Sequence, residues 1–428
     1  MKKLLTVCLI TILIFVFAAA SAGAQILTAP MLDADSELDI ESLKEAREEV
    51  WENYKAARLS DEAVVEEMEN SAMRFGDAVM RFYAENYGEM PENGYPIYIA
   101  MHGGGANDTP DFNDAQWADM VEYYSDALEC GVYVAVRGVR DTWDTHFNPE
   151  SYPLYDRLIE YLILVGSVDP NRVYLEGFSA GGDGVYAVGA RMADRFAAAN
   201  MSSGHPNNIS MVNFYNLPIQ LQAGEYDDAF DRNTMTAKYG LILDELEAEN
   251  PGAYQHRTLI HADCGHNYED YDREPIPVMA DVAGWLENGN RETVNVDSFP
   301  PDWMDQFVRD PIPPTIMWDL GTRAELRETD AYYYLSADKN THGTIFVQYG
   351  DNDVVIGTDG LDGDFSIFFN EDMIDFSLPV HFEVAGVGEL DVMLIPERAW
   401  LETTTMDRGD PNFQFEAAVS YEWLVENM

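Results

Sequence analysis

The chain has 428 residues, of which 46% are hydrophobic, and a formal net charge of −52 at pH 7. This length favours two domains over one, and the hydrophobic content is sufficient for large buried cores. A surface this acidic repels nucleic acids and anionic membranes, which excludes proteins that bind either by charge.

The acidic residues are spread along the whole chain among apolar ones, and lysine is nearly absent. Such a surface repels itself and destabilises the compact state unless salt screens the charges. We therefore expect a protein adapted to high salt. An acidic disordered tail, the alternative source of this charge, does not fit so even a distribution.

The first 24 residues have the pattern of a signal peptide. Lys2 and Lys3 are followed by the apolar run Leu4–Phe17 and the small residues Ala22-Gly23-Ala24. We expect cleavage near Ala24 and a secreted or periplasmic protein. No later stretch is long and apolar enough to span a membrane, so none is expected in the mature chain.

The next segment, residues 25–90, is expected to be helical, because Glu41–Ala57 and Asp61–Tyr87 show apolar residues at helical spacing. Residues 91–290 then alternate strand and helix, which predicts an α/β domain with a mostly parallel sheet. The expected strands are Ile97–Met101, Val132–Val136, Val173–Phe178, Ala197–Met201, Ile219–Ala223 and Arg257–His261. The expected helices are Gln116–Gly131, Tyr155–Val165, residues 179–195 and Thr234–Glu249.

The pattern changes after residue 290. Residues 291–314 are rich in proline and are interpreted as a linker. Residues 315–428 consist of short alternating apolar and polar runs separated by turns such as Asp362-Gly363-Asp364, which predicts an antiparallel β-domain similar to a sandwich.

The run Gly177-Phe178-Ser179-Ala180-Gly181 follows a predicted strand and opens a predicted helix. This G-x-S-x-G pattern is typical of a nucleophile elbow, in which glycines let strand and helix approach while strain exposes the serine hydroxyl. Alone the pattern is weakly specific, since chains of this length match it by chance. Ser179 is therefore a candidate nucleophile whose support must come from other residues.

Donors for an oxyanion can be found upstream. Gly103, Gly104 and Gly105 come directly after a predicted strand, in the run Met101-His102-Gly103-Gly104-Gly105, and can direct backbone N–H groups to one point. The N–H of Ala180, just after the serine, is the second expected donor. The alternative for the glycine run is an ordinary tight turn.

An acid and a base are expected at the ends of later strands. Asp227 follows the strand ending at Ala223, with Asp228 and Glu225 as alternatives. His266 follows the strand ending near His261, and His261 itself is its chief rival. The resulting order of serine, acid and histidine matches a Ser-Asp-His hydrolase.

Residues from about 94 to 288 resemble secreted α/β-hydrolases of the esterase type, related to poly(3-hydroxybutyrate) depolymerases, feruloyl esterases and the prolyl-oligopeptidase/dienelactone-hydrolase group. The resemblance is carried by the segments 97–105, Val168-Asp169-Pro170-Asn171-Arg172-Val173-Tyr174, 177–182 and Gly265-His266. It implies Ser179 as nucleophile, His266 as base, Asp227 as orienting acid, and an acyl-enzyme formed without metal or cofactor. The chain departs from the depolymerase pattern in having no proline after the acid.

The expected substrate is a small or polymeric ester. Trp143, His146 and Phe147 lie in a loop that follows a strand and are candidates to line the pocket, together with His102 and His205. The alternative is that the aromatic residues cover the sheet edge. A serine peptidase of the prolyl-oligopeptidase group and a non-catalytic binding protein are the other functions considered.

After the signal segment, Cys130 and Cys264 remain, and they either form one disulfide or stay as buried thiols. A calcium site among Asp351, Asp353, Asp359, Asp362 and Asp364 is the weaker interpretation of that region, because their spacing does not match an EF-hand loop and hairpin turns in an acidic protein look the same. No metal site is predicted.

Overall fold

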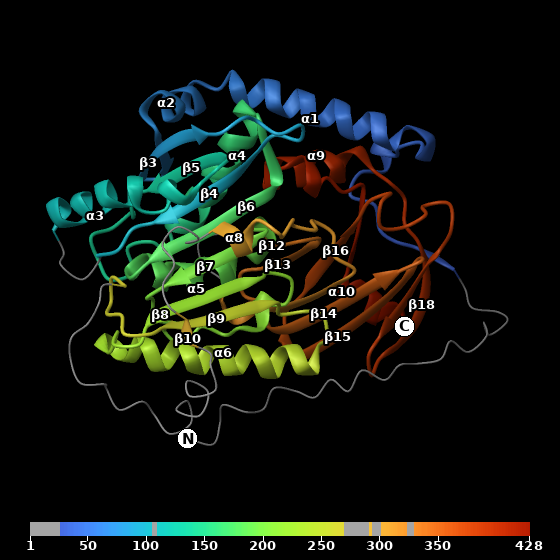
Figure 1. The fold of residues 1–428 in the computed structure, drawn as a ribbon. Helices are drawn as coiled ribbons and strands as arrows, with labels where there is room; N and C mark the ends of the chain where they lie inside the picture. The colour runs from blue at the N-terminus through green and yellow to red at the C-terminus, as the bar shows by residue number, and fades with distance from the viewer. Residues whose placement is uncertain (1–25, 105–108, 269–290, 293–300, 323–328) are drawn as a thin grey trace.

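The structure is a computed structural model that describes residues 26–104, 109–268, 291–292, 301–322 and 329–428. Within them, a nine-stranded sheet has the order β10-β9-β8-β7-β6-β4-β5-β3-β2, and β4 to β10 run parallel (Figure 1). The prediction of an α/β-hydrolase fold with a mostly parallel central sheet is thus confirmed. Its parallel strands are β4 (Tyr95–Met101), β5 (Gly131–Val136), β6 (Val168–Phe178), β7 (Ala198–Ser202), β8 (Ile219–Gly224), β9 (His256–His261) and β10 (Arg291–Glu292).

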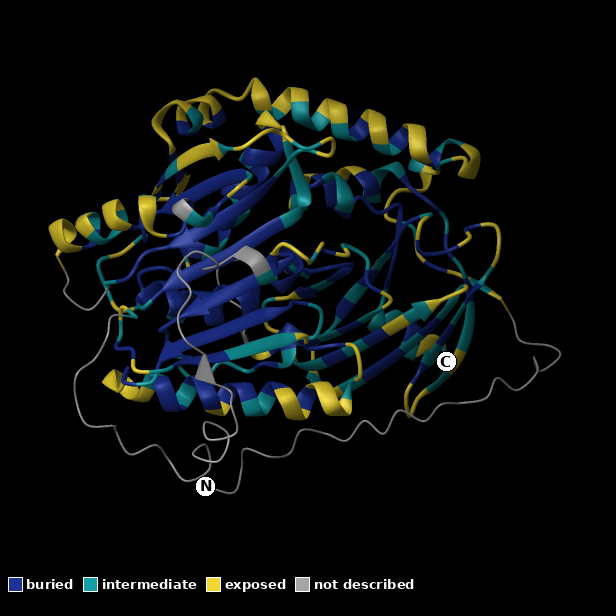
Figure 2. Ribbon diagram, in the orientation of Figure 1, coloured by how far each residue is buried: buried dark blue, intermediate teal, exposed yellow. Residues whose placement is uncertain are grey.

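Helices cover this sheet on both faces, and alternation along the strands explains why. In β4, Ile97 and Ile99 pack into one core, with α4, α5 and α6, while Tyr98 and Ala100 pack into another, with α3. The central strands are therefore buried on both faces, as Figure 2 shows. The helices are α3 (Pro110–Tyr123), α4 (Ser151–Val165), α5 (Ala180–Arg191) and α6 (Arg232–Glu249).

The N-terminal segment is helical only in part. Helices α1 (Leu43–Leu59) and α2 (Glu62–Asn70) are present, but the prediction of a helix through Tyr87 is wrong. Residues 72–87 instead form a hairpin of β2 (Ala72–Phe75) and β3 (Ala78–Tyr87), and β3 pairs antiparallel with β5. Pairing with a sheet edge outweighs the helix propensity of this segment.

The C-terminal part contains two further sheets. Among the described residues, the larger has the order β1-β18-β17-β15-β14-β11 and the smaller β12-β13-β16-β19. These additional sheets are mainly antiparallel, as predicted, but β1 (Leu27–Thr28) pairs parallel with β18 and β15 pairs parallel with β17. The other strands are β11 (Thr315–Asp319), β12 (Thr329–Tyr332), β13 (Leu335–Asp338), β14 (His342–Gly350), β15 (Asp353–Asp362), β16 (Phe365–Phe369), β17 (Val380–Val384), β18 (Gly388–Met393) and β19 (Ala417–Ser420). The helices are α8 (Pro301–Met304), α9 (Arg398–Arg408) and α10 (Tyr421–Asn427).

The two parts share one hydrophobic core, which extends from the helices beside the central sheet into the C-terminal sheets. Buried ion pairs also cross this junction. Arg191, at the end of α5, lies 2.6 Å from Asp330 of β12, and Arg309 lies 2.8 Å from Asp410. Arg309 belongs to the segment predicted as a linker, and it also donates to the Asn171 side chain at 2.9 Å and to the backbone carbonyl of Asp194 at 3.1 Å, so that it contacts both parts.

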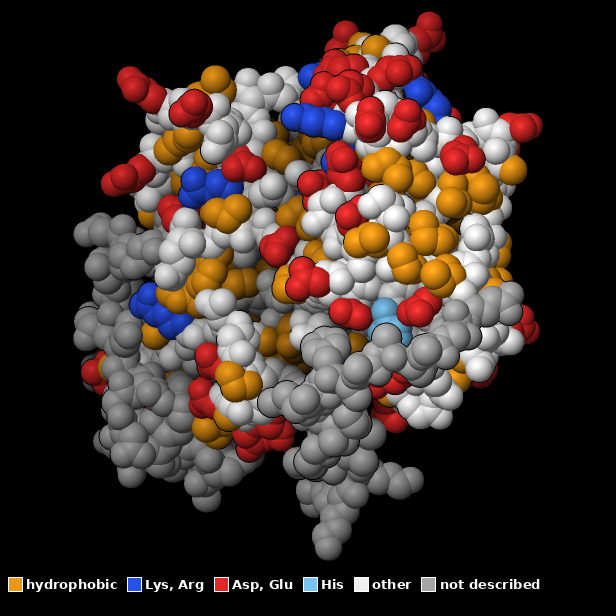
Figure 3. Space-filling model, turned by 90° about the vertical axis from the view of Figure 1, so that its right-hand side faces the viewer, with side chains coloured by type: hydrophobic (Ala, Val, Ile, Leu, Met, Phe, Trp, Pro, Cys, Tyr) orange, Lys and Arg blue, Asp and Glu red, His pale blue; other side chains and the backbone are white. Residues whose placement is uncertain are grey.

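The surface is acidic, as the composition requires. On the face shown in Figure 3, Asp and Glu side chains are scattered among hydrophobic ones, and Lys and Arg form a few isolated spots. In the part of the chain that the structure describes, no helix combines the length and hydrophobicity needed to cross a membrane. The predicted signal peptide lies outside the described residues.

Candidate active site

Ser179 occupies a sharp corner between β6 and α5. Its backbone has φ 56° and ψ −117°, a strained conformation for a residue with a side chain. Glycines make this corner possible: a Cβ on Gly177 would lie 2.3 Å from the carbonyl oxygen of Gly181, and one on Gly181 would lie 2.0 Å from that of Met101. The G-x-S-x-G run therefore folds as strand, tight corner and helix.

Three side chains from different strand ends meet at this corner. The Oγ of Ser179 lies 3.0 Å from Nε2 of His266, and Nδ1 of His266 lies 2.9 Å from Oδ2 of Asp227. Asp227 is 1% exposed, whereas the His266 side chain is 31% exposed. These distances allow Asp227 to accept a hydrogen bond from Nδ1–H of His266, which leaves Nε2 free to accept one from the serine hydroxyl.

The rival residues lie elsewhere in their loops. Glu225 accepts a hydrogen bond from the backbone N–H of Asp263, at 3.1 Å. His261 is buried and lies 2.9 Å from Gln222, and burial lowers the pKa of His261 to about 4. The structure thus brings Asp227 and His266, rather than Glu225 or His261, to Ser179.

The glycine-rich turn also reaches this corner. A Cβ on Gly103 would lie 3.3 Å from the Cβ of Ser179, so the turn passes directly beside the serine. Gly104 has φ 104°, and a Cβ there would lie 2.6 Å from Asn113. Ala180 is the first residue of α5. Gly105, the third glycine of the predicted oxyanion turn, lies outside the described residues.

The prediction that His102 and His146 line a substrate pocket needs correction, because both are fully buried. Nε2 of His102 accepts from the N–H of Gly138 at 3.0 Å, and Nε2 of His146 donates to the carbonyl of His102 at 2.8 Å. Burial lowers the pKa of His102 to about 4 and that of His146 well below its ordinary value. The two rings are therefore neutral, and their hydrogen bonds connect the glycine-rich turn after β4 to the loop at residues 138–146.

The other predicted lining residues lie nearer the surface. Trp143 is 57% exposed, and its ring meets that of Phe147 edge-on at 5.2 Å. His205 is half-buried, and its backbone N–H donates to Oδ1 of Asp183 at 2.6 Å.

Two supporting residues were missed in the sequence. The hydroxyl of Ser203 donates to the backbone carbonyl of His266 at 3.0 Å, and Ser203 has φ 51°. Asp183, in the first turn of α5, also accepts from the Asn207 side chain at 3.1 Å, and burial raises the pKa of Asp183. No local pattern marks such residues, since their partners lie 22 or more positions away.

Cys130 and Cys264 are both thiols, and neither forms a disulfide. Among the described residues, no three His, Cys, Asp or Glu side chains gather in a group that could hold a metal ion. Asp353, Asp359 and Asp362 lie in β15, and Asp351 and Asp364 lie in the turns before and after it.

No family model matches the chain, and no curated protein matches it. Solved structures similar to it include a thermostable esterase, with 19% identity and a TM-score of 0.36. This match covers 56% of the present chain and 62% of the esterase chain. Est1E from Butyrivibrio proteoclasticus is 14% identical, and the match covers 46% of this chain and 90% of Est1E with a TM-score of 0.32. A dienelactone hydrolase from Anabaena variabilis is 13% identical, and the match covers 56% of this chain and 96% of that chain with a TM-score of 0.33. These likenesses are too weak to carry an argument about activity.

Proposed function

We propose that this protein is a serine hydrolase that cleaves carboxylic esters through an acyl-enzyme. The observation that carries the proposal is the continuous chain of contacts from Ser179 through His266 to Asp227, with a glycine-rich turn beside the serine. A partly exposed serine on a strained corner, a histidine within hydrogen-bond distance and a buried acid are the parts that acyl transfer requires.

In the first half of the cycle, His266 accepts the proton of Ser179 at Nε2 while Oγ attacks the ester carbonyl. The carbonyl oxygen becomes an oxyanion that accepts from the backbone N–H groups of the glycine-rich turn at Gly103 and Gly104 and from that of Ala180. His266 then donates its proton to the leaving alcohol. Asp227 stays ionised and stabilises the imidazolium through the 2.9 Å contact.

In the second half, a water molecule takes the place of the alcohol. His266 accepts a proton from this water as its oxygen attacks the acyl carbonyl, and the same N–H groups stabilise the new oxyanion. Collapse of the intermediate releases the acid and returns the proton to Ser179. No step requires a metal or a cofactor.

The test compares wild type with Ser179→Ala on p-nitrophenyl acetate and on an aminoacyl p-nitroanilide. We expect ester hydrolysis in the wild type, its loss by at least 10³-fold in the variant, and an unchanged circular dichroism spectrum. Preference for the anilide would establish a peptidase instead. Turnover of the ester by Ser179→Ala at the wild-type rate would refute the proposal.

A further inference from the structure

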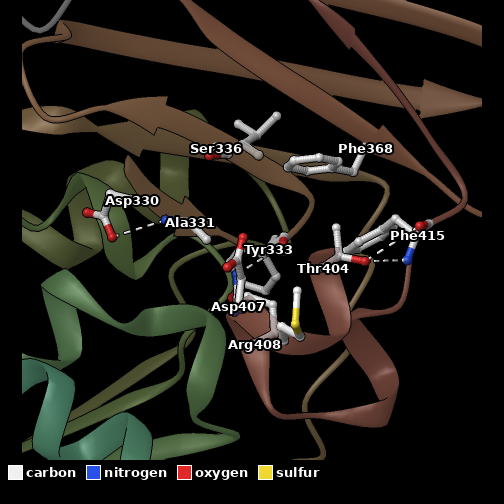
Figure 4. A pocket seen from close by; sticks show the side chains of 11 residues that line it. Asp330, Ala331, Tyr333, Ser336, Phe368, Thr404, Asp407, Arg408 and Phe415 are labelled. Carbon is white, nitrogen blue, oxygen red and sulfur yellow. Dashed lines mark hydrogen bonds between the residues drawn. The ribbon is translucent and has the colours of Figure 1, made fainter. Parts of the chain in front are cut away.

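A pocket that shares no residue with the proposed triad lies between the smaller C-terminal sheet and α9. Its volume is about 320 Å³. Figure 4 shows Phe368 and Ser336 on the sheet side and Thr404 and Arg408 on α9, with Tyr333 between them. Ligand sites commonly occupy junctions of this kind and begin at roughly 300 Å³.

The wall of the pocket is aromatic. The rings of Phe368 and Phe415 lie 5.9 Å apart with an interplanar angle of 26°, and Tyr333 and Leu335 complete the apolar lining. Tyr333 is fixed from both parts of the molecule: its N–H donates to Asp194 and its carbonyl accepts from Arg408. Its φ of 54° is uncommon for an aromatic residue, so this wall is held in place at a cost in free energy.

The charged groups of the lining are already engaged in ion pairs. Asp330 lies 2.6 Å from Arg191, and Arg408 pairs with Asp194. A ligand charge would thus have to compete with an existing partner. The exposed Asp407 at the rim, together with the net charge of the chain, further disfavours an anion. Ser336 also lines the pocket, and its hydroxyl can donate a hydrogen bond to a neutral oxygen.

We infer that this pocket binds a small neutral aromatic molecule that carries a hydroxyl or carbonyl oxygen. The ring would lie against Phe368 and Phe415, and its oxygen would reach Ser336. The volume supports this size, since an apolar cavity of about 150 Å³ already holds benzene. The inference does not depend on the proposed ester hydrolysis, because no residue of the pocket belongs to the proposed triad.

Benzyl alcohol is the probe, and the ¹³C-labelled methyl group of Met406, 64% exposed at the rim, is the reporter. We expect a saturable shift of this signal, identified by its loss in Met406→Leu. Cyclohexylmethanol, benzoate and benzylammonium should each bind at least about tenfold more weakly, which is a difference of about 1.4 kcal/mol.

Ser336→Phe and the smaller change Ser336→Leu fill the pocket, and both should weaken binding at least tenfold. Ser60→Phe makes the same exchange at an exposed residue outside the pocket and should leave binding unchanged. Ser179→Ala should also retain binding, which separates this inference from the proposed function. Absence of saturable binding, equal binding by a folded Ser336 variant, or equally tight binding of the non-aromatic or charged probes would overturn the inference.

Discussion

Ser179 is held in a conformation that costs of order 1–3 kcal/mol, and the close packing of Gly177 and Gly181 makes that conformation accessible. The same corner places Oγ beside His266. His266 in turn packs its ring against Phe178, 5.1 Å between centroids, and its backbone carbonyl accepts from Ser203. The orientation of the imidazole is thus determined from several directions.

Asp227 is the acid whose assignment gains most from a direct test, because Glu225 and Asp228 are close in sequence. We expect Asp227→Asn to lower kcat about 10⁴-fold, since an amide cannot stabilise the imidazolium and favours the wrong tautomer. Asp228→Asn and Glu225→Gln are the matched controls and should retain most activity. Steady-state kinetics on p-nitrophenyl acetate measures all three, and equal losses in the controls would contradict the role given to Asp227.

At the scale of single residues, the sequence is sufficient to select the candidate catalytic residues but not to predict which side chains are buried. Ser179, Asp227 and His266 could be selected because each follows a strand, and the carboxyl ends of parallel strands meet at one edge. The burial of His102 and His146 could not be predicted, because it depends on how the loop around residue 146 folds under the glycine turn.

At the scale of elements, the N-terminal segment is fastened to the C-terminal part. Strand β1 pairs with β18, and Arg47 of α1 lies 3.2 Å from Glu416, just before β19. Arg47 also lies 2.7 Å from Asp372 and contacts Glu371. Glu416 is fully buried, and burial raises its pKa to about 8 despite the nearby guanidinium.

This burial predicts a pH-dependent effect of Glu416→Gln. A carboxyl whose pKa is raised on folding stabilises the fold at pH values below its unfolded pKa, and this contribution is lost as the pH rises through about 8. The variant, which resembles the protonated acid, should match the wild-type Tm near pH 5 and exceed it by several degrees near pH 9.

Calorimetry across this pH range measures the effect. Glu371→Gln removes another carboxylate from the same arginine at a partly exposed site and is the control, for which we expect no gain at pH 9. A Tm difference between Glu416→Gln and wild type that stays constant with pH would contradict this account of Glu416.

The error in the 72–87 region has a physical cause. The helix was predicted from apolar residues at helical spacing, and alanine, methionine and arginine, which favour helices, are frequent there. The buried residues Met80 and Phe82 are two apart, as in a strand, and Gly76 has φ 57° in the turn that precedes β3. The turn was a local signal for a hairpin, whereas pairing with β5 could not be predicted from local sequence.

At the scale of the whole molecule, charge is the dominant feature. A net charge of −52 on one folded chain implies strong self-repulsion, and the Debye length falls from about 10 Å at 0.1 M salt to about 3 Å at 1 M. We propose that the protein is adapted to high salt.

Scanning calorimetry from 0.1 to several molar NaCl tests this proposal. The Tm should rise continuously, and KCl should act equally because screening depends on ionic strength. A Tm that is constant or falls over this range would contradict salt adaptation.

The most direct test of the central claim is the site of covalent labelling by a fluorophosphonate probe, found by mass spectrometry of the digested protein. The contacts among Ser179, His266 and Asp227 predict one label per chain, on Ser179, and much slower labelling of His266→Ala. Labelling of a different serine, or a folded wild-type protein that hydrolyses p-nitrophenyl acetate without reacting at Ser179, would contradict it.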